Sequence, residues 1–430
     1  MMKIATGQSE NVMRLRTRLF AGSVRWAAPV VLLLTLFYFH AGNTVQDPYA
    51  AEYAPAVVAA PLMTLYALAY ASAAALAVWE SGRLRAFGVW DMAPARSRYR
   101  VAGDALLPVI LCAWLVVLVP TVLSLGSAGT LPTPDSLLLP GMAMLLCVAH
   151  AIIGFAIGLR APHVVAAPVV AVLVWVAVAF TRAVDPAWVR HISGQYTDLM
   201  FGEAPSLLSL APHLLFGGAI AAGLAMMWLP VRQLLVRAAL ALVVACAGTA
   251  SAIAIADDWA HGTPLRHGQV AMECLGARPK VCMPAVTAQD LPHVRADVVS
   301  ALRDLTRAKA VTPPEVVTDR LGEGRDNRSS TPANWSVHLT VAAREDAVKY
   351  AVTLAAVRLP CDEPDPARAY AVRLWAFSVT GEAEAFRSTA ENKSLVSRSE
   401  PEVRAVLEKS TDQQAVWYQQ QISDACGRAS

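Results

Sequence analysis

The chain has 430 residues, of which 56% are hydrophobic and only 16% are charged, and its formal net charge is +3. The apolar residues are concentrated in the first 256 positions, and an ordinary polar composition follows. A single soluble domain is excluded, because such a domain accounts for one or two long apolar runs, whereas this chain has seven. The sequence therefore predicts an α-helical polytopic membrane protein followed by a small α+β domain.

The chain opens with a basic arm, residues 1–25, which we expect to lie in the cytoplasm. Seven apolar runs follow, most of them near the roughly 20 residues that cross the hydrocarbon core of a bilayer. Because backbone amides find no water there, even the valine-rich runs are expected to be helical. The predicted spans of this membrane domain, residues 26–256, are 26–41, 55–79, 103–125, 137–159, 164–181, 207–229 and 238–256.

The distribution of Lys and Arg between the spans predicts the orientation of the chain. The N-terminal arm and the loops after the second, fourth and sixth spans are basic, whereas the alternate loops carry only Arg182 and Arg190. Basic short loops are retained on the cytoplasmic side. Rich use of Ala, Val and Arg indicates a bacterial source. We therefore expect a multi-pass protein of the bacterial cell membrane, with a cytoplasmic N-terminus and with residues 257–430 outside the cytoplasm.

The external residues 257–430 are predicted to form a small α+β domain. Apolar residues at helical spacing indicate a helix over 289–310, and further helices are expected over 347–359 and 401–407. Alternation over 337–341 indicates a half-buried strand. The charges of this domain are nearly balanced, so no nucleic-acid partner is expected.

Four of the seven cysteines lie in the external domain, namely Cys274, Cys282, Cys361 and Cys426. An even number of cysteines outside the cytoplasm favours two disulfides, because disulfides persist in oxidising compartments. Four cysteines allow three connectivities. We favour Cys274 with Cys282 and Cys361 with Cys426, and unpaired thiols are the alternative. No metal site is expected, because no His pair at ligand spacing accompanies them.

The segment after the second span is too long for a simple turn and is predicted to form a short amphipathic helix at the inner membrane surface. Glu80 stands where the span ends, Arg83 and Arg85 follow, and Pro94 closes the run. The apolar residues at helical spacing are Leu84, Phe87 and Trp90. A helix that only rests on lipid headgroups has the same pattern and remains an alternative interpretation.

This segment resembles the corresponding part of type-2 ABC transporter permeases. Glu80 and Arg83 match the charged start of the family's motif, residues 93–96 match its proline-containing turn, and Gly103 matches the start of its third span. The resemblance extends to residues 145–180 and covers roughly the first 230 residues. It implies a coupling helix that docks on an ATPase subunit. The implied coupling residues are Glu80, Arg83, Arg85, Phe87, Trp90, Asp91, Pro94, Arg96 and Arg98.

Sequence motifs for catalysis are absent from the chain. No G-x-x-x-x-G-K-[ST] loop, H-E-x-x-H motif or G-x-S-x-G motif occurs. We therefore expect no enzymatic activity and no cofactor in this chain, with ATP and Mg²⁺ on a separate ATPase. Among ionisable side chains we single out His150, inside a predicted span, as a possible path residue. A neutral imidazole bonded to a neighbouring helix is its alternative role.

The resemblance predicts a permease subunit of an exporter that couples hydrolysis by a separate ABC ATPase to substrate movement. Its further partners are the lipid bilayer and a second permease copy or paralogue. Replacing Glu80 or Arg83 is expected to abolish transport without changing abundance. The alternative is a membrane-anchored sensory or interaction protein whose external domain binds a ligand or an envelope partner.

Overall fold

The computed structural model divides the chain into two compact units, Met1–His267 and Gly268–Ser430. It describes residues 22–42, 52–90, 97–229, 233–267, 270–323, 330–361, 363–389 and 393–427. Three predicted coupling residues, Asp91, Pro94 and Arg96, lie outside the described residues, as does most of the N-terminal arm. Residues 257–267, expected in the external domain, belong to the first unit because strand β2 (Leu265–His267) pairs there with β1 (Glu203–Pro205).

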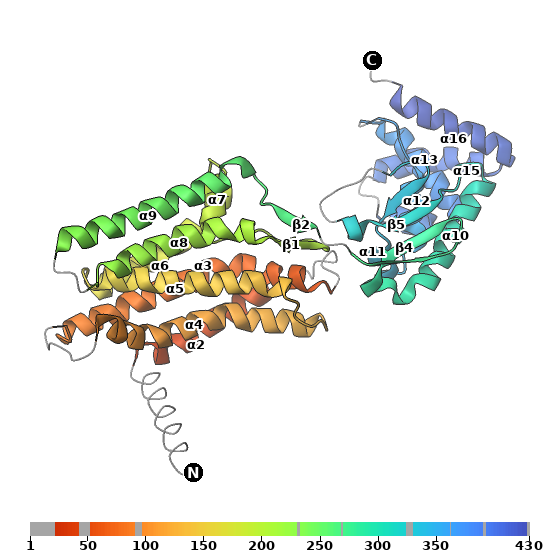
Figure 1. The fold of residues 1–430 in the computed structure, drawn as a ribbon. Coiled ribbons are helices and arrows are strands. Elements are labelled where there is room, and N and C mark those ends of the chain that lie inside the picture. The colour runs from red at the N-terminus through yellow and green to blue at the C-terminus, as the bar shows by residue number, and fades with distance from the viewer. Residues whose placement is uncertain are drawn as a thin grey trace, which may run out of the picture. The chain divides into compact units, whose positions relative to one another are not determined.

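The first unit is a bundle of apolar helices that run side by side (Figure 1). They are α2 (Val24–Gly42), α3 (Ala54–Ala86), α4 (Arg98–Ser127), α5 (Leu138–Gly158), α6 (His163–Ala179), α7 (Trp188–Ile192), α8 (Leu207–Met226) and α9 (Leu234–Ala256). Among the described residues, six helices have the length and composition of membrane spans, and α6, with 17 residues, is shorter. Every predicted apolar run is helical, as expected.

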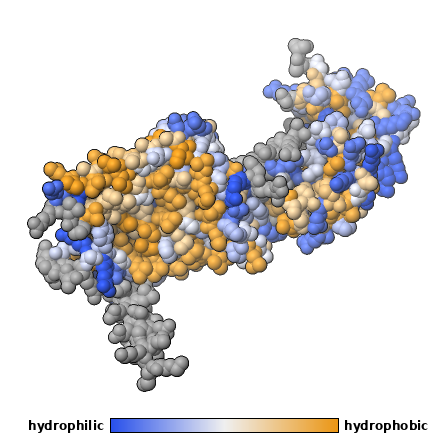
Figure 2. Space-filling view, in the orientation of Figure 1, coloured by the Kyte–Doolittle hydropathy of each residue, from blue (hydrophilic) through white to orange (hydrophobic). Residues whose placement is uncertain are grey.

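The outer surface of this bundle is apolar. Figure 2 shows hydrophobic residues over most of the helices of the first unit. Helix α9 is an extreme case, because only 6% of its apolar window is buried, and Leu235 is 84% exposed. Soluble proteins rarely expose such continuous apolar surface to water. The first unit therefore has the build of a membrane-embedded helical protein.

Helix α3 is the central element of the bundle and packs mainly against α4, α5 and α6. It has 33 residues and continues without a break through the position where the second span was expected to end. Residues 80–86, which were predicted to begin a separate amphipathic helix, are therefore part of α3, and the predicted end of that helix at Pro94 lies outside the described residues. Gly82 lies within the helix, in close contact with His163. The helix ends at Ala86, shortly before Gly88, whose φ is +62°.

Glycines bring α3 and α5 into close backbone contact. A Cβ atom added at Gly154 would lie less than 3.0 Å from the carbonyl of Ala74, and one at Gly158 would meet the carbonyl of Val78 in the same way. The two glycines are one helical turn apart on α5, a small-residue pattern typical of helix pairs in membranes. This contact holds the centre of the bundle together.

The second unit combines a four-stranded sheet with helices, which agrees with the predicted α+β class. The strands are β3 (Met272–Leu275), β4 (Lys280–Pro284), β5 (Val316–Asp319) and β6 (Asn334–Val337), in that order across the sheet. Strands β3 and β4 are antiparallel, and the other two pairs are parallel. The helices are α10 (Leu291–Arg307), α11 (Leu339–Arg344), α12 (Val348–Ala356), α13 (Pro366–Thr380), α14 (Ala383–Ser388), α15 (Lys393–Leu407) and α16 (Thr411–Cys426).

Both expected disulfides are confirmed. Cys274 and Cys282 face each other on β3 and β4, and Cys361 joins Cys426 at the end of α16. The three free cysteines of the described residues all lie on helices of the first unit. The external placement that the disulfides suggest stays a prediction.

The two disulfides are expected to differ in their contribution to stability. The Cys361–Cys426 bridge closes a segment of 65 residues and the Cys274–Cys282 bridge one of 8. On the loop-entropy account, the longer bridge should stabilise the second unit by about 2 kcal/mol more. Alanine pairs at each bridge, compared by thermal unfolding of the purified protein, check this. Equal losses for the two pairs would contradict the loop-entropy account here.

Candidate functional site

The residues of the predicted coupling segment divide into an inner and an outer group at one end of the bundle. This end, called the Arg83 end below, contains the end of α3 and the start of α4. Glu80, Arg83 and Arg85 lie on the last turns of α3, Phe87 and Trp90 follow it, and Arg98 opens α4. The described residues of the segment therefore lie on or next to the end of α3 and the start of α4.

Glu80 belongs to the inner group and is only 4% exposed. One carboxylate oxygen accepts the backbone N–H of Ser23 at 2.6 Å, and the other lies 3.1 Å from the guanidinium of Arg83. The Arg83 side chain is 35% exposed. Glu80 thus connects α3 to the start of α2, and it cannot offer a docking surface to another protein.

Trp90 also faces the interior of the unit. Its ring contacts Phe155 edge-on at 6.4 Å, Phe155 contacts Trp228 at 5.5 Å, and Trp228 contacts Tyr99 at 5.9 Å. The Tyr99 hydroxyl donates to the carbonyl of Ala225 at 2.8 Å. These aromatic rings join α4, α5 and the end of α8.

The outer group consists of Arg85, Phe87 and Arg98, which are all exposed. Phe87 is 68% exposed, and Arg85 donates a long hydrogen bond of 3.4 Å to the carbonyl of Leu159. An exposed aromatic ring between arginines is a composition that protein interfaces favour. These three residues form the part of the predicted segment that another subunit can reach.

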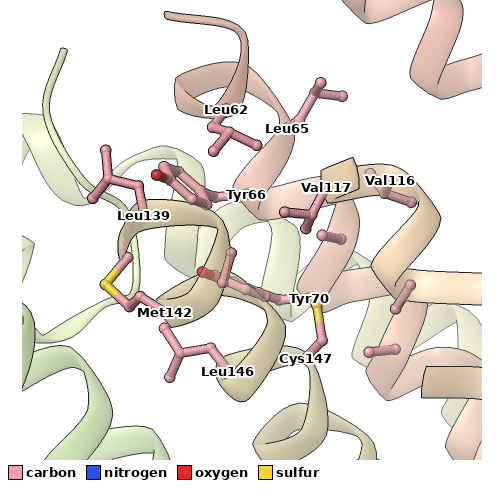
Figure 3. Close-up of a cluster of buried hydrophobic side chains, with 14 of the residues drawn as sticks. Leu62, Leu65, Tyr66, Tyr70, Val116, Val117, Leu139, Met142, Leu146 and Cys147 are labelled. Atoms are coloured by element: carbon pink, nitrogen blue, oxygen red, sulfur yellow. The ribbon is translucent and has the colours of Figure 1, made fainter. Parts of the chain in front are cut away.

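A second set of polar side chains lies inside the bundle, between α3, α5 and α8. It comprises Tyr66, Tyr70, His150, Tyr196 and His213, and we call it the tyrosine–histidine cluster. His150 stacks on Tyr70 with ring centroids 4.8 Å apart, and Tyr196 lies 6.0 Å from His213. Figure 3 shows that the hydroxyls of Tyr66 and Tyr70 point to the same side of α3. The predicted path residue His150 is therefore one member of a larger polar group.

A partly buried segment without regular structure, residues 193–202, contributes Gly194 and Tyr196 to the cluster. Tyr70 donates to the carbonyl of Gly194 at 2.9 Å, and the Gly194 amide donates to Nδ1 of His213 at 3.0 Å. Gly194 has a φ of +87°, and a Cβ there would come within 2.9 Å of the Tyr70 ring. Only glycine fits both requirements. In membrane proteins, non-helical backbone is tolerated where surrounding protein buries it.

Two polar atoms of the cluster have no hydrogen-bond partner among the described residues. They are the hydroxyl of Tyr66 and Nε2 of His213. Because Nδ1 of His213 accepts a hydrogen bond, Nε2 carries the proton of the neutral ring. Neither side chain is more than 1% exposed. Unsatisfied buried donors are costly, and polar groups inside a membrane protein often mark a path or site.

His150 was predicted from the sequence as a candidate residue, whereas the other four members of the cluster were not. His213 could have been predicted as a candidate because it is a polar residue inside an apolar run. Tyr66 and Tyr70 gave a second signal, since they lie one helical turn apart on α3. The partner of Tyr70, however, is 124 positions away in the sequence. No local pattern predicts such a contact.

In the second unit, the side chains of His293, Asp297 and Asp346 are the group within the described residues that could hold a metal ion. Their ligand atoms lie within 4.8 Å of one another, and Nε2 of His293 is 3.6 Å from Asp297. The His293 side chain is 72% exposed. No sequence motif joins these residues, and the contact between His293 and Asp297, one helical turn apart on α10, accounts for the arrangement of the first two.

Asp319 is a buried carboxylate whose role is structural. It accepts hydrogen bonds from the amides of Leu321 and Thr340 at 3.1 and 2.9 Å, and from the Thr340 hydroxyl. Burial raises the pKa of the Asp319 carboxyl above its ordinary value, despite these donors. The carboxylate fixes the end of β5 against the first turn of α11.

Comparisons with known proteins add no relative to these observations: no family model, no curated protein and no solved structure matches this chain.

Proposed function

We propose that this chain is the membrane permease subunit of a type-2 ABC transporter, working in export with a separate ATPase. The observation that carries the proposal is that one unbroken helix, α3, connects the exposed Arg83 end with the interior tyrosine–histidine cluster. Arg85 and Tyr70 are 15 residues apart on it, which corresponds to about 22 Å. A push applied at Arg85 would therefore move the cluster.

The packing of α3 supports transmission rather than local bending. Gly154 and Gly158 hold α5 against its backbone, so α3 and α5 move as one body. Closure of an ATPase dimer against Arg85, Phe87 and Arg98 would shift this body relative to α4 and α8. ATP and Mg²⁺ act on the partner, and this chain supplies the path, with a second permease copy completing it.

The proposed orientation places the Arg83 end in the cytoplasm and the second unit outside. Basic loops at the Arg83 end and two disulfides in the second unit support it independently. The ATPase would then meet the outer group from the cytoplasm.

Affinity purification of the full chain from its native membrane tests the proposal. Co-purifying proteins are identified by mass spectrometry for wild type, for an R85E/R98E variant and for R278E. R278E is a control for arginine-to-glutamate reversal, with half the charge change of the double variant, because the Arg278 side chain is 83% exposed in the second unit. We expect a P-loop ATPase with wild type and R278E, and at least a tenfold loss with R85E/R98E. Absence of an ATPase from wild type, or equal recovery from all three proteins, would contradict the proposal.

The alternative, a membrane-anchored sensory or interaction protein, is favoured by a cavity in the second unit. This cavity has a volume of about 490 Å³ and lies beside Trp335, with Glu315 and Arg358 in its lining. The Arg358 guanidinium lies 5.1 Å from the Trp335 ring and donates to the carbonyl of Ser330 at 3.1 Å. Its size is within the range of small-molecule sites. The same purification distinguishes the two functions, because only the permease requires the ATPase.

A further inference from the structure

A lateral groove runs between α2, α3 and α6, with a volume of about 600 Å³. Its walls are apolar and include Trp26, Val30, Leu76, Ala167, Pro168 and Ala171. Trp26 is 73% exposed and Val30 is 57% exposed, so the groove opens on the outer surface of the bundle. In a membrane-embedded unit, this surface faces lipid.

One end of the groove is basic. Arg25 and Arg83 line it together with Ser23, whose amide binds Glu80. The Arg25 guanidinium lies 5.1 Å from the centroid of the Trp26 ring. Glu80 pairs with Arg83, so among the described residues at this end two guanidinium groups lie beside one buried carboxylate. A long apolar wall with a basic end is complementary to an anionic amphiphile, which has an apolar chain and a negatively charged headgroup.

We propose that this groove binds one anionic phospholipid, with its phosphate at Arg25 and Arg83 and an acyl chain along α2, α3 and α6. Basic pockets between membrane helices recognise anionic lipid headgroups in this way, and each basic residue near the headgroup contributes about a fivefold gain in affinity. The proposal does not depend on the permease function, because it concerns the lining of this groove and not the exposed Arg85, Phe87 and Arg98.

Native mass spectrometry of the detergent-solubilised full chain tests the site. Binding of the first phosphatidylglycerol is compared with that of phosphatidylcholine of the same acyl chains, and inorganic phosphate is added in a separate series. We expect wild type to prefer phosphatidylglycerol at least fivefold. R25Q should lose most of this preference, and R100Q should keep it, because Arg100 is exposed on α4 and does not line the groove.

A steric variant tests the apolar wall separately from the charge. A171W places an indole in the groove and should weaken binding of both lipids, while R25Q affects only the anionic one. Monodisperse elution of each variant confirms that it is folded. An unchanged preference in R25Q, or an equal loss in R25Q and R100Q, would overturn the proposal. Displacement of phosphatidylglycerol by millimolar phosphate would also overturn it, since it would show a site for free anions.

Discussion

Gly154→Leu is expected to prevent assembly of the helical bundle. Even a Cβ atom at this position would lie less than 3.0 Å from the backbone carbonyl of Ala74, and a backbone atom cannot move aside as a side chain can. Helix α5 would have to separate from α3, which also breaks the neighbouring contact at Gly158. We expect monodisperse protein from detergent extracts to fall at least tenfold, measured by size-exclusion chromatography.

Gly141 supplies the matched control on the same helix. A Cβ there meets no atom within 4 Å, so G141L should leave the yield of monodisperse protein close to that of wild type. G154A is the intermediate case, with an expected loss of about 1–3 kcal/mol from overpacking. Equal yields of G154L and G141L would show that the close approach of α3 and α5 does not hold the bundle together.

The spans were predictable because their signal is composition over a fixed length, which a bilayer imposes independently of tertiary structure. The ends of the spans were less predictable. The predicted end at residue 79 rested on the charge of Glu80, which the structure neutralises by pairing with Arg83 and by the Ser23 amide. A charged residue that is satisfied internally does not end a helix.

In the second unit, amphipathic helices were predictable and fully buried ones were not. Helix α10 was found from its apolar face, on which Val294, Val298 and Leu305 are buried. Helix α13 was missed because nearly every side chain over residues 369–377 is buried, which leaves no polar face to give a period. The strand predicted over 337–341 is wrong except at Val337, because β6 covers residues 334–337 and residues 339–341 begin α11, where the Asp319 carboxylate binds the Thr340 amide.

The candidate site depends on contacts that no local pattern contains. Gly194 binds Tyr70 and His213, which lie 124 and 19 positions away. The cysteines were an exception, because only four lie outside the apolar runs and two of these face each other across a short hairpin. Covalent chemistry restricts the possible partners in a way that hydrogen bonding does not.

Replacing Glu80 is expected to destabilise the first unit rather than to uncouple an intact one. E80A removes the acceptor of the Ser23 amide and leaves the Arg83 guanidinium without this carboxylate. Breaking a buried ion pair from one side costs about 3–5 kcal/mol, and because Arg83 is 35% exposed we expect about 2–3 kcal/mol here. The loss is measured by the temperature at which half of the detergent-solubilised protein aggregates. This result would replace the expectation, drawn from the sequence, that Glu80 variants keep normal abundance.

A double-mutant cycle separates the ion pair from the coupling surface. R83Q should be worse than E80Q, because it leaves a buried carboxylate without its cation, whereas glutamine at position 80 still accepts the Ser23 amide. E80Q/R83Q should recover most of the stability lost in R83Q, since neither charge is then left alone.

R85E and R98E should leave stability unchanged, because both arginines are exposed. An E80Q/R83Q protein that is stable and retains the ATPase would show that the buried pair serves to hold α2 to α3. An R85E/R98E protein that is stable and loses the ATPase would show that the exposed arginines contact the partner. Additive losses in the cycle would show that Glu80 and Arg83 act independently.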